Sequence, residues 1–77
     1  MGNEVKYQAL VGDVLRLLVE RAAQAGGPPG SFDQGVKMGY FEAVASIMNE
    51  LETFGIDAKD VGMEGFDPMT MLIRKAA

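Results

Sequence analysis

Apolar residues recur every three or four positions between residues 4 and 25, which is the spacing of an α-helix. Asn3 can cap the start of this helix, and Gly26 stands where a helix commonly ends. At about 100° per residue, the apolar positions cover roughly two-thirds of the helix circumference. A surface helix needs an apolar stripe only a little over 100° wide. The sequence therefore predicts a helix over 4–25 with more apolar surface than one neighbour can cover.

A second helical pattern covers residues 32–54. Ser31 and Gln34 match a capping box at its start, and Gly55 stands where it ends. One apolar face is expected from eight residues at helical spacing: Phe32, Val36, Tyr40, Ala43, Val44, Ile47, Leu51 and Phe54.

The segment GGPPGS, residues 26–31, has the length and composition of a tight connection between antiparallel helices. Residues 57–67 lack helical periodicity and can hold one short turn. Asp67 as the cap and Pro68 at the first helical position predict a short C-terminal helix over 68–76. Its core-facing residues would be Met69, Leu72, Ile73 and Ala76.

The whole chain, residues 1–77, is expected to form a single all-α domain: an antiparallel helical hairpin with a short C-terminal helix. A chain of 77 residues buries a modest core, and the absence of cysteine removes disulfides as a further source of stability. Self-association remains a way to enlarge the core. Two hairpins related by a two-fold axis would form a four-helix bundle, so we expect a homodimer.

A row of small residues lies beside the apolar face of the second helix: Gly35, Gly39, Ala43 and Ser46. Each glycine inside a helix costs roughly 1 kcal/mol relative to alanine. Close approach of another helix can offset this cost. Three interpretations are open: the first helix of the same chain fills the row, a helix of a second copy fills it, or the row accommodates a ligand or a peptide from another protein.

On the first helix, the outer apolar residues Leu10, Val14, Leu17 and Leu18 are the expected interface residues. Glu50 lies next to the apolar face of the second helix, where Arg16 or Arg21 of the opposing helix could pair with it and set the register.

Composition argues against catalysis. The chain contains no histidine and no cysteine, so the commonest general base, thiolate chemistry and the usual transition-metal ligands are missing. We therefore expect no enzyme activity, no catalytic residues, no metal site and no cofactor. The net charge of −4 and the scattered basic residues disfavour nucleic-acid and anionic-membrane partners. The longest apolar stretch contains Asp13 and Arg16, and the start lacks a signal-peptide pattern, so a cytoplasmic location is expected.

The leading functional hypothesis is a self-associating helical protein that works through protein–protein contacts, as a regulator, adaptor or subunit. The alternative is a small-molecule-binding protein with a pocket between helices, lined by Tyr40, Met38 and Phe41. Met63, Met69 and Met71 lie close together in the sequence, and filling gaps in the core is the preferred interpretation over an adaptable binding surface.

Overall fold

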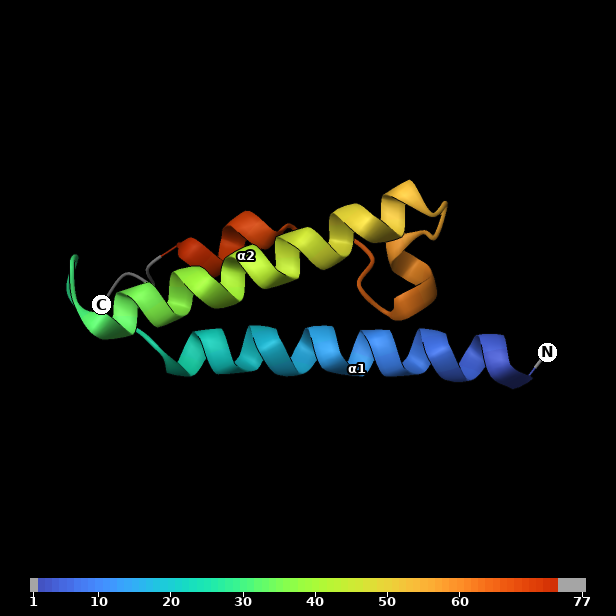
Figure 1. Ribbon diagram of the computed structural model, residues 1–77, viewed down its shortest axis with the longest axis horizontal. Helices are drawn as coiled ribbons and strands as arrows, with labels where there is room; N and C mark the ends of the chain where they lie inside the picture. Colours follow the sequence, from blue (N-terminus) through green and yellow to red (C-terminus); the bar gives the residue numbers. More distant parts are fainter. Residues whose placement is uncertain (1, 74–77) are drawn as a thin grey trace.

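The computed structural model describes residues 2–73. Two long helices, α1 (Gly2–Gln24) and α2 (Phe32–Thr53), pack antiparallel (Figure 1). Two short 3-10 helices follow, η1 (Ala58–Val61) and η2 (Pro68–Leu72). The prediction of an all-α antiparallel hairpin is confirmed. Residues 57–67 contain η1, as the sequence allowed, and a further turn closed by the bond from the N–H of Phe66 to the carbonyl of Met63. Residues 74–76 of the expected C-terminal helix lie outside the described part of the chain.

The loop between the two helices begins and ends differently from the sequence pattern. Gly26 does not adopt the left-handed conformation expected of a helix-terminating glycine, and α1 ends at Gln24. At the start of α2, the Ser31 hydroxyl accepts the N–H of Gln34 at 3.1 Å, as predicted. The Gln34 side chain, however, accepts the N–H of Gly30 at 2.6 Å. The capping box is therefore half formed, because Gln34 satisfies the loop instead of Ser31.

The end of α2 follows the prediction closely. Gly55 has a φ of 74° and donates its N–H to the carbonyl of Glu52 at 3.0 Å. Ile56 donates to the carbonyl of Leu51 at 2.8 Å. These two bonds are those of a Schellman motif, and the partly buried Ile56 makes the apolar contact that accompanies it. Glycine is required here because a side chain disfavours this positive φ.

The C-terminal helix differs from its prediction. Asp67 caps it as expected, accepting the N–H of Met69 at 3.0 Å. The element is a 3-10 helix, because the N–H of Thr70 bonds to the carbonyl three residues back, at Asp67, over 2.9 Å. Ile73 is already extended, with a ψ of 125°. The α-helix predicted from residue 68 onward is thus wrong for the five residues of η2.

This change of helix type alters which side chains reach the core. Met71 is buried, whereas Met69 and Ile73, both expected to face inward, are exposed, and Leu72 is half-buried. A 3-10 helix repeats every three residues, so the side chains leave the positions that an α-helical period assigns to them. Core filling by methionine is confirmed for Met63 and Met71 but not for Met69.

The core lies between α1, α2 and the segment that carries η1 and η2. Leu15 on α1 and Val44 on α2 are fully buried at its centre. The remaining buried apolar residues are Ala22, Leu51, Val61, Met63 and Met71. The ends of the face expected on α2 are not part of this core, since Phe32 and Phe54 are 85% and 74% exposed. Each segment is needed, because the hairpin alone has one interface and little core.

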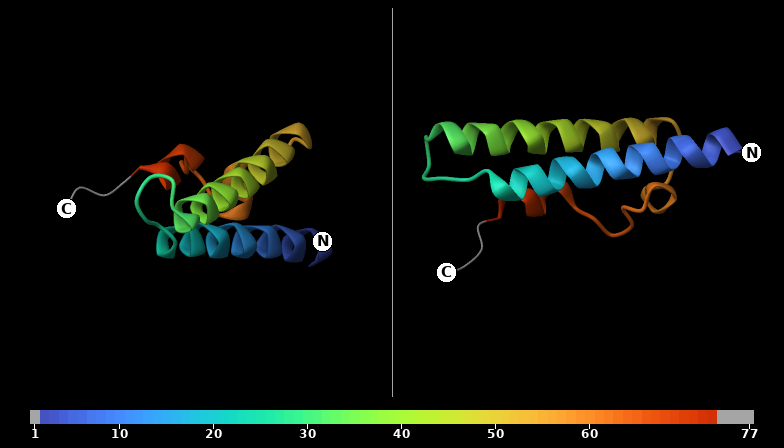
Figure 2. Two further views of the ribbon diagram at one scale, coloured as in Figure 1. Left: turned by 60° about the vertical axis from the view of Figure 1, so that its left-hand side comes forward. Right: turned by 90° about the horizontal axis from the view of Figure 1, so that it is seen from below.

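The two 3-10 helices lie on one side of the hairpin. η1 packs mainly against α1 and η2 mainly against α2, and Figure 2 shows both on the same side of the plane of the long helices. We call this the covered side, and the opposite face of α1 and α2 the open side. The radius of gyration is 13.7 Å, compared with about 11.5 Å for a typical 77-residue domain. The molecule is thus elongated, with extents of 46 × 21 × 17 Å.

Candidate interaction face

Gly12 brings α1 and η1 together on the covered side. A Cβ added at Gly12 would overlap the carbonyl oxygen of Val61. Arg16, one turn later, donates from Nη1 to the same carbonyl at 3.3 Å and from Nη2 to Asp13 at 2.6 Å. Gly12 therefore allows the backbone of η1 to lie directly on α1. The sequence analysis missed this residue, although an isolated glycine within a long helical pattern was the available signal.

The small-residue row of α2 has no such neighbour. A Cβ added at Gly35 or Gly39 would meet no atom within 4 Å, and Ala43 and Ser46 are exposed as well. The interpretation that the first helix of the same chain fills this row is therefore wrong. Helix α1 packs against a different face of α2, the one centred on Val44. The two other interpretations stay open, in which the row is filled by a helix of a second copy or accommodates a ligand or a peptide from another protein.

A second row lies along α1. Leu10, Val14 and Leu17 are 58%, 39% and 47% exposed, and Tyr7, which was not among the expected interface residues, is 66% exposed. Leu18 is half-buried against the core. Residues 7, 10, 14 and 17 alternate steps of three and four, the spacing of a coiled-coil seam. We call Tyr7, Leu10, Val14 and Leu17 the α1 row.

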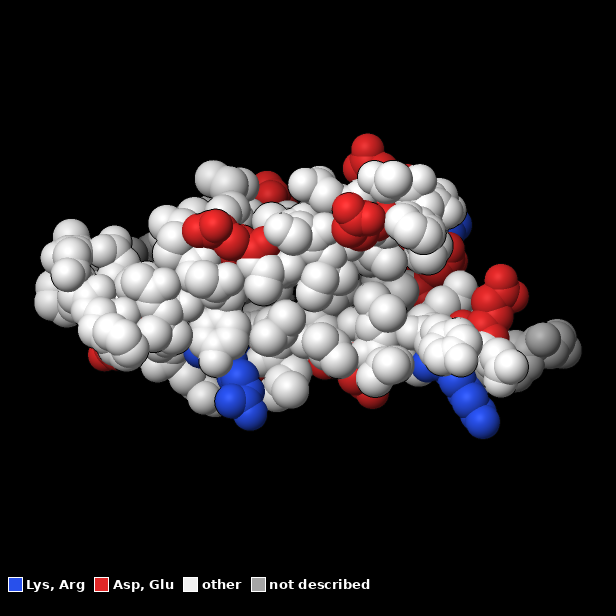
Figure 3. Space-filling view, viewed as in Figure 1, with Lys and Arg blue, Asp and Glu red and all other residues white. Residues whose placement is uncertain are grey.

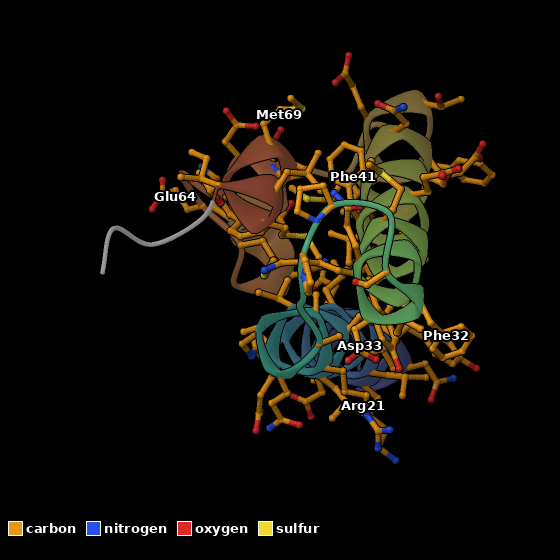
Figure 4. All side chains as sticks on the ribbon, turned by 90° about the vertical axis from the view of Figure 1, so that its left-hand side faces the viewer. Arg21, Phe32, Asp33, Phe41, Glu64 and Met69 are labelled. Carbon is orange, nitrogen blue, oxygen red and sulfur yellow. The ribbon has the colours of Figure 1, made fainter. Side chains whose placement is uncertain are left out.

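Both rows face the open side. At about 100° per residue, each row is centred roughly 120–140° around its helix from the buried residue, Leu15 or Val44. Figure 4 looks along the helices and shows Phe32 on the open side, whereas Glu64 and Met69 lie with the covering segment. Figure 3 shows a band without charged side chains across both helices, with mainly acidic groups along its upper margin and both basic and acidic groups along its lower margin. The open side is thus a continuous, largely apolar face.

The three residues expected to line a pocket are not gathered around one cavity. Tyr40 and Phe41 pack against the core, and Phe41 points between α2 and η2 (Figure 4). Met38 lines a shallow hollow of about 430 Å³ beside the interhelical loop, together with Gly26, Gly27, Pro29, Gln34, Lys37 and Leu72. Nothing in this arrangement favours a ligand site formed jointly by the three side chains.

Among the described residues, ion pairing is confined to one pair on α1. Across residues 2–73, Arg16 and Asp13 form the one ion pair. The expected pairing of Glu50 with Arg16 or Arg21 is wrong, because Arg16 lies against η1 and Glu50 is exposed. Within the same residues, no cluster of three or more metal-ligating side chains occurs, and no buried side-chain polar atom lacks a partner.

Neither long helix combines the length and apolar character needed to cross a membrane, within the described part of the chain. In comparisons with known proteins, no family model, no curated protein and no solved structure matches this chain.

Proposed function

We propose that the protein self-associates and acts through protein–protein contacts, as a regulator, adaptor or subunit of a larger assembly. The observation that carries this proposal is the open side, where the large apolar residues of the α1 row are 39–66% exposed and a Cβ added at Gly35 or Gly39 would meet no atom of the described residues within 4 Å. Contiguous exposed apolar surface of more than a few hundred Å² is rare on monomers and typical of interaction sites.

The helix propensity of the two glycines in the row gives a further argument for the proposal. Gly35 and Gly39 together weaken α2 by roughly 2 kcal/mol relative to alanine. No contact within residues 2–73 offsets this cost, since the space beside both residues is empty. A partner helix that approaches the backbone closely would offset it.

Sedimentation equilibrium tests the proposal directly. We expect the average mass to rise from that of one chain towards twice that value between about 1 and 100 µM, the range of ordinary specific association. The melting temperature is expected to rise with protein concentration, because association stabilises the folded state by mass action. A mass of one chain over the whole range, with a constant melting temperature, would contradict self-association.

Two matched substitutions locate the contact. Leu17→Glu introduces a charge on the open side, and Met69→Glu introduces the same charge on η2, at residues of similar exposure, 47% and 56%. We expect Leu17→Glu to abolish association, because the charge would be buried without a partner, and Met69→Glu to leave it unchanged. Equal effects of the two variants would exclude the open side as the contact.

A further inference from the structure

We propose that the occupant of the open side is a second copy in one defined register, in which α1 of each copy lies antiparallel on the small-residue row of α2 in the other. This inference rests on the proposed function and adds the arrangement of the two chains. It makes large residues of one subunit face small residues of its partner.

The heights of the two rows along the hairpin carry this inference. Helix α1 ends at residue 24 and α2 begins at residue 32, so residues at equal distance from the loop have numbers that add up to about 56. Leu17 and Gly39 lie at one height, and Leu10 and Ser46 at another. Val14 lies within one residue of Ala43, a difference of about 1.5 Å along the axis. Large and small residues thus occupy matching levels on neighbouring helices.

A two-fold axis parallel to the helices would place residues at the same height on α1 of one copy and α2 of the other opposite each other. Rotation about such an axis leaves every residue at its own height but exchanges the positions of α1 and α2. Leu17 of one copy would therefore face Gly39 of the partner subunit, and Leu10 would face Ser46 of the partner subunit. Each large side chain inserts where its neighbour has almost none, which is the complementarity that knobs-into-holes packing requires.

The exposed area is that of a stable interface. A large apolar side chain carries roughly 100–200 Å². The exposed fractions of the α1 row and Phe32 thus amount to about 500 Å² of apolar surface. A standard interface buries about 800 Å² on each partner, of which roughly 60% is apolar. The face of one copy thus supplies the apolar area that the face of another needs.

Charge is arranged consistently with the same axis. The rotation brings the mainly acidic upper margin in Figure 3 onto the lower margin of the partner, which carries basic groups together with some acidic ones. Lys6 and Glu50 are both exposed, have opposite charge and lie at the same height along the hairpin. Each would meet the other across the interface, once on either side of the two-fold axis and both times at the same end of the dimer.

A competing arrangement has its axis across the helices, so that α1 packs on α1 and α2 on α2. It brings the two α1 rows together, with Val14 near its own symmetry copy, and sets Gly39 against the small row of the partner. The contact between the two α1 helices would then be overpacked with large side chains, and the contact between the two α2 helices would contain empty space beside the glycines. Both overpacking and voids are unfavourable at an interface packed as densely as a protein interior.

Cysteine cross-linking distinguishes the two arrangements. Because the chain contains no cysteine, every disulfide formed must involve the introduced residues. Leu17→Cys protein is mixed with an equal amount of Gly39→Cys protein under mild oxidation. A disulfide needs Cβ atoms about 3.5–4.5 Å apart, so only facing residues join efficiently. We expect a heterodisulfide from this pair and from Leu10→Cys with Ser46→Cys. The control pair, Leu17→Cys with Ser46→Cys, lies two turns out of register, about 10 Å, and should yield several-fold less.

The outcomes separate the register from self-association itself. Efficient disulfides in both matched pairs and not in the control support the register. Efficient self-cross-linking of Val14→Cys without heterodisulfides overturns the register while self-association stands. An unmodified chain that sediments as a single copy at all concentrations overturns both. Circular dichroism of each variant establishes that it is folded, which we expect because every substituted residue is exposed.

Charge exchange gives a second, independent measurement. Lys6→Glu and Glu50→Lys should each weaken association, and the double variant should recover most of the lost affinity. Failure of the double variant to recover it would overturn the register.

Discussion

Gly12 and Gly39 are both glycines in the interior of long helices, and both weaken their helix by roughly 1 kcal/mol relative to alanine. At Gly12 the backbone of η1 occupies the space that a side chain would take. At Gly39 that space is empty. The covered side thus contains the contact that explains its glycine, whereas no contact among residues 2–73 explains the glycine on the open side.

The same contrast separates two leucines of α1 that are two residues apart. Leu15 is fully buried at the centre of the core, and Leu17 is 47% exposed on the open side. Two residues correspond to about 200° around a helix, so neighbouring leucines face different surroundings. Substitutions on the two sides should therefore differ in kind: covered-side variants change folding, and open-side variants change association.

The largest effect is expected from the leucine pair. Leu15→Ala should lower the free energy of unfolding by about 2–5 kcal/mol, because it leaves a cavity in the core. Leu17→Ala, measured in urea at a concentration low enough for single chains, should change it by less than about 1 kcal/mol. Similar losses for the two variants would show that Leu17 belongs to the folding core and that the distinction between the sides is false.

Gly12→Ala should have the next largest effect. The added methyl group overlaps the backbone of Val61, so η1 must move away from α1. We expect a loss of about 1–3 kcal/mol, the usual range for overpacking, despite the better helix propensity of alanine. Thermal unfolding followed by circular dichroism measures the loss, and an increase in stability would contradict the close contact.

Gly39→Ala is the matched open-side variant. Without a neighbour to overlap, the alanine should stabilise the dilute single chain by up to about 1 kcal/mol. Gly39→Leu should also fold, but it should lose association because its side chain fills the space meant for the partner. If Gly39→Leu sediments as the parent protein does, the small-residue row has no part in the contact.

The smallest effect is expected from Asp13→Asn. Its ion pair with Arg16 is short, but the two side chains are 75% and 50% exposed, so solvent and salt screen the attraction. The free energy of unfolding should fall by less than about 1 kcal/mol. Arg16 would keep its bond to the carbonyl of Val61. A larger loss in chemical denaturation would mean that Asp13 holds Arg16 against η1.

Local patterns in the sequence were sufficient for the two long helices and for both ends of α2, but not for the ends of α1, since Asn3 lies inside that helix and Gly26 does not terminate it. Ser31 and Gly55 act within a few residues of their own position, so their effect does not depend on the rest of the fold. The over-wide apolar surface of α1 was also visible, because periodicity alone assigns residues to faces. The same reasoning failed at η2, where packing against the hairpin selected a 3-10 helix over the α-helix that Pro68 and its cap permit.

Only the tertiary structure decided which glycine has an intramolecular partner and which rows are left uncovered. Gly12, Gly35 and Gly39 have the same propensity, and nothing local distinguishes them. The difference arises because residues 57–73 return along one side of the hairpin, which brings Val61 onto α1 and leaves the other side without a covering segment among the described residues. Contacts between residues about 50 positions apart determine this choice, and a pattern with a period of three or four residues carries no information about them.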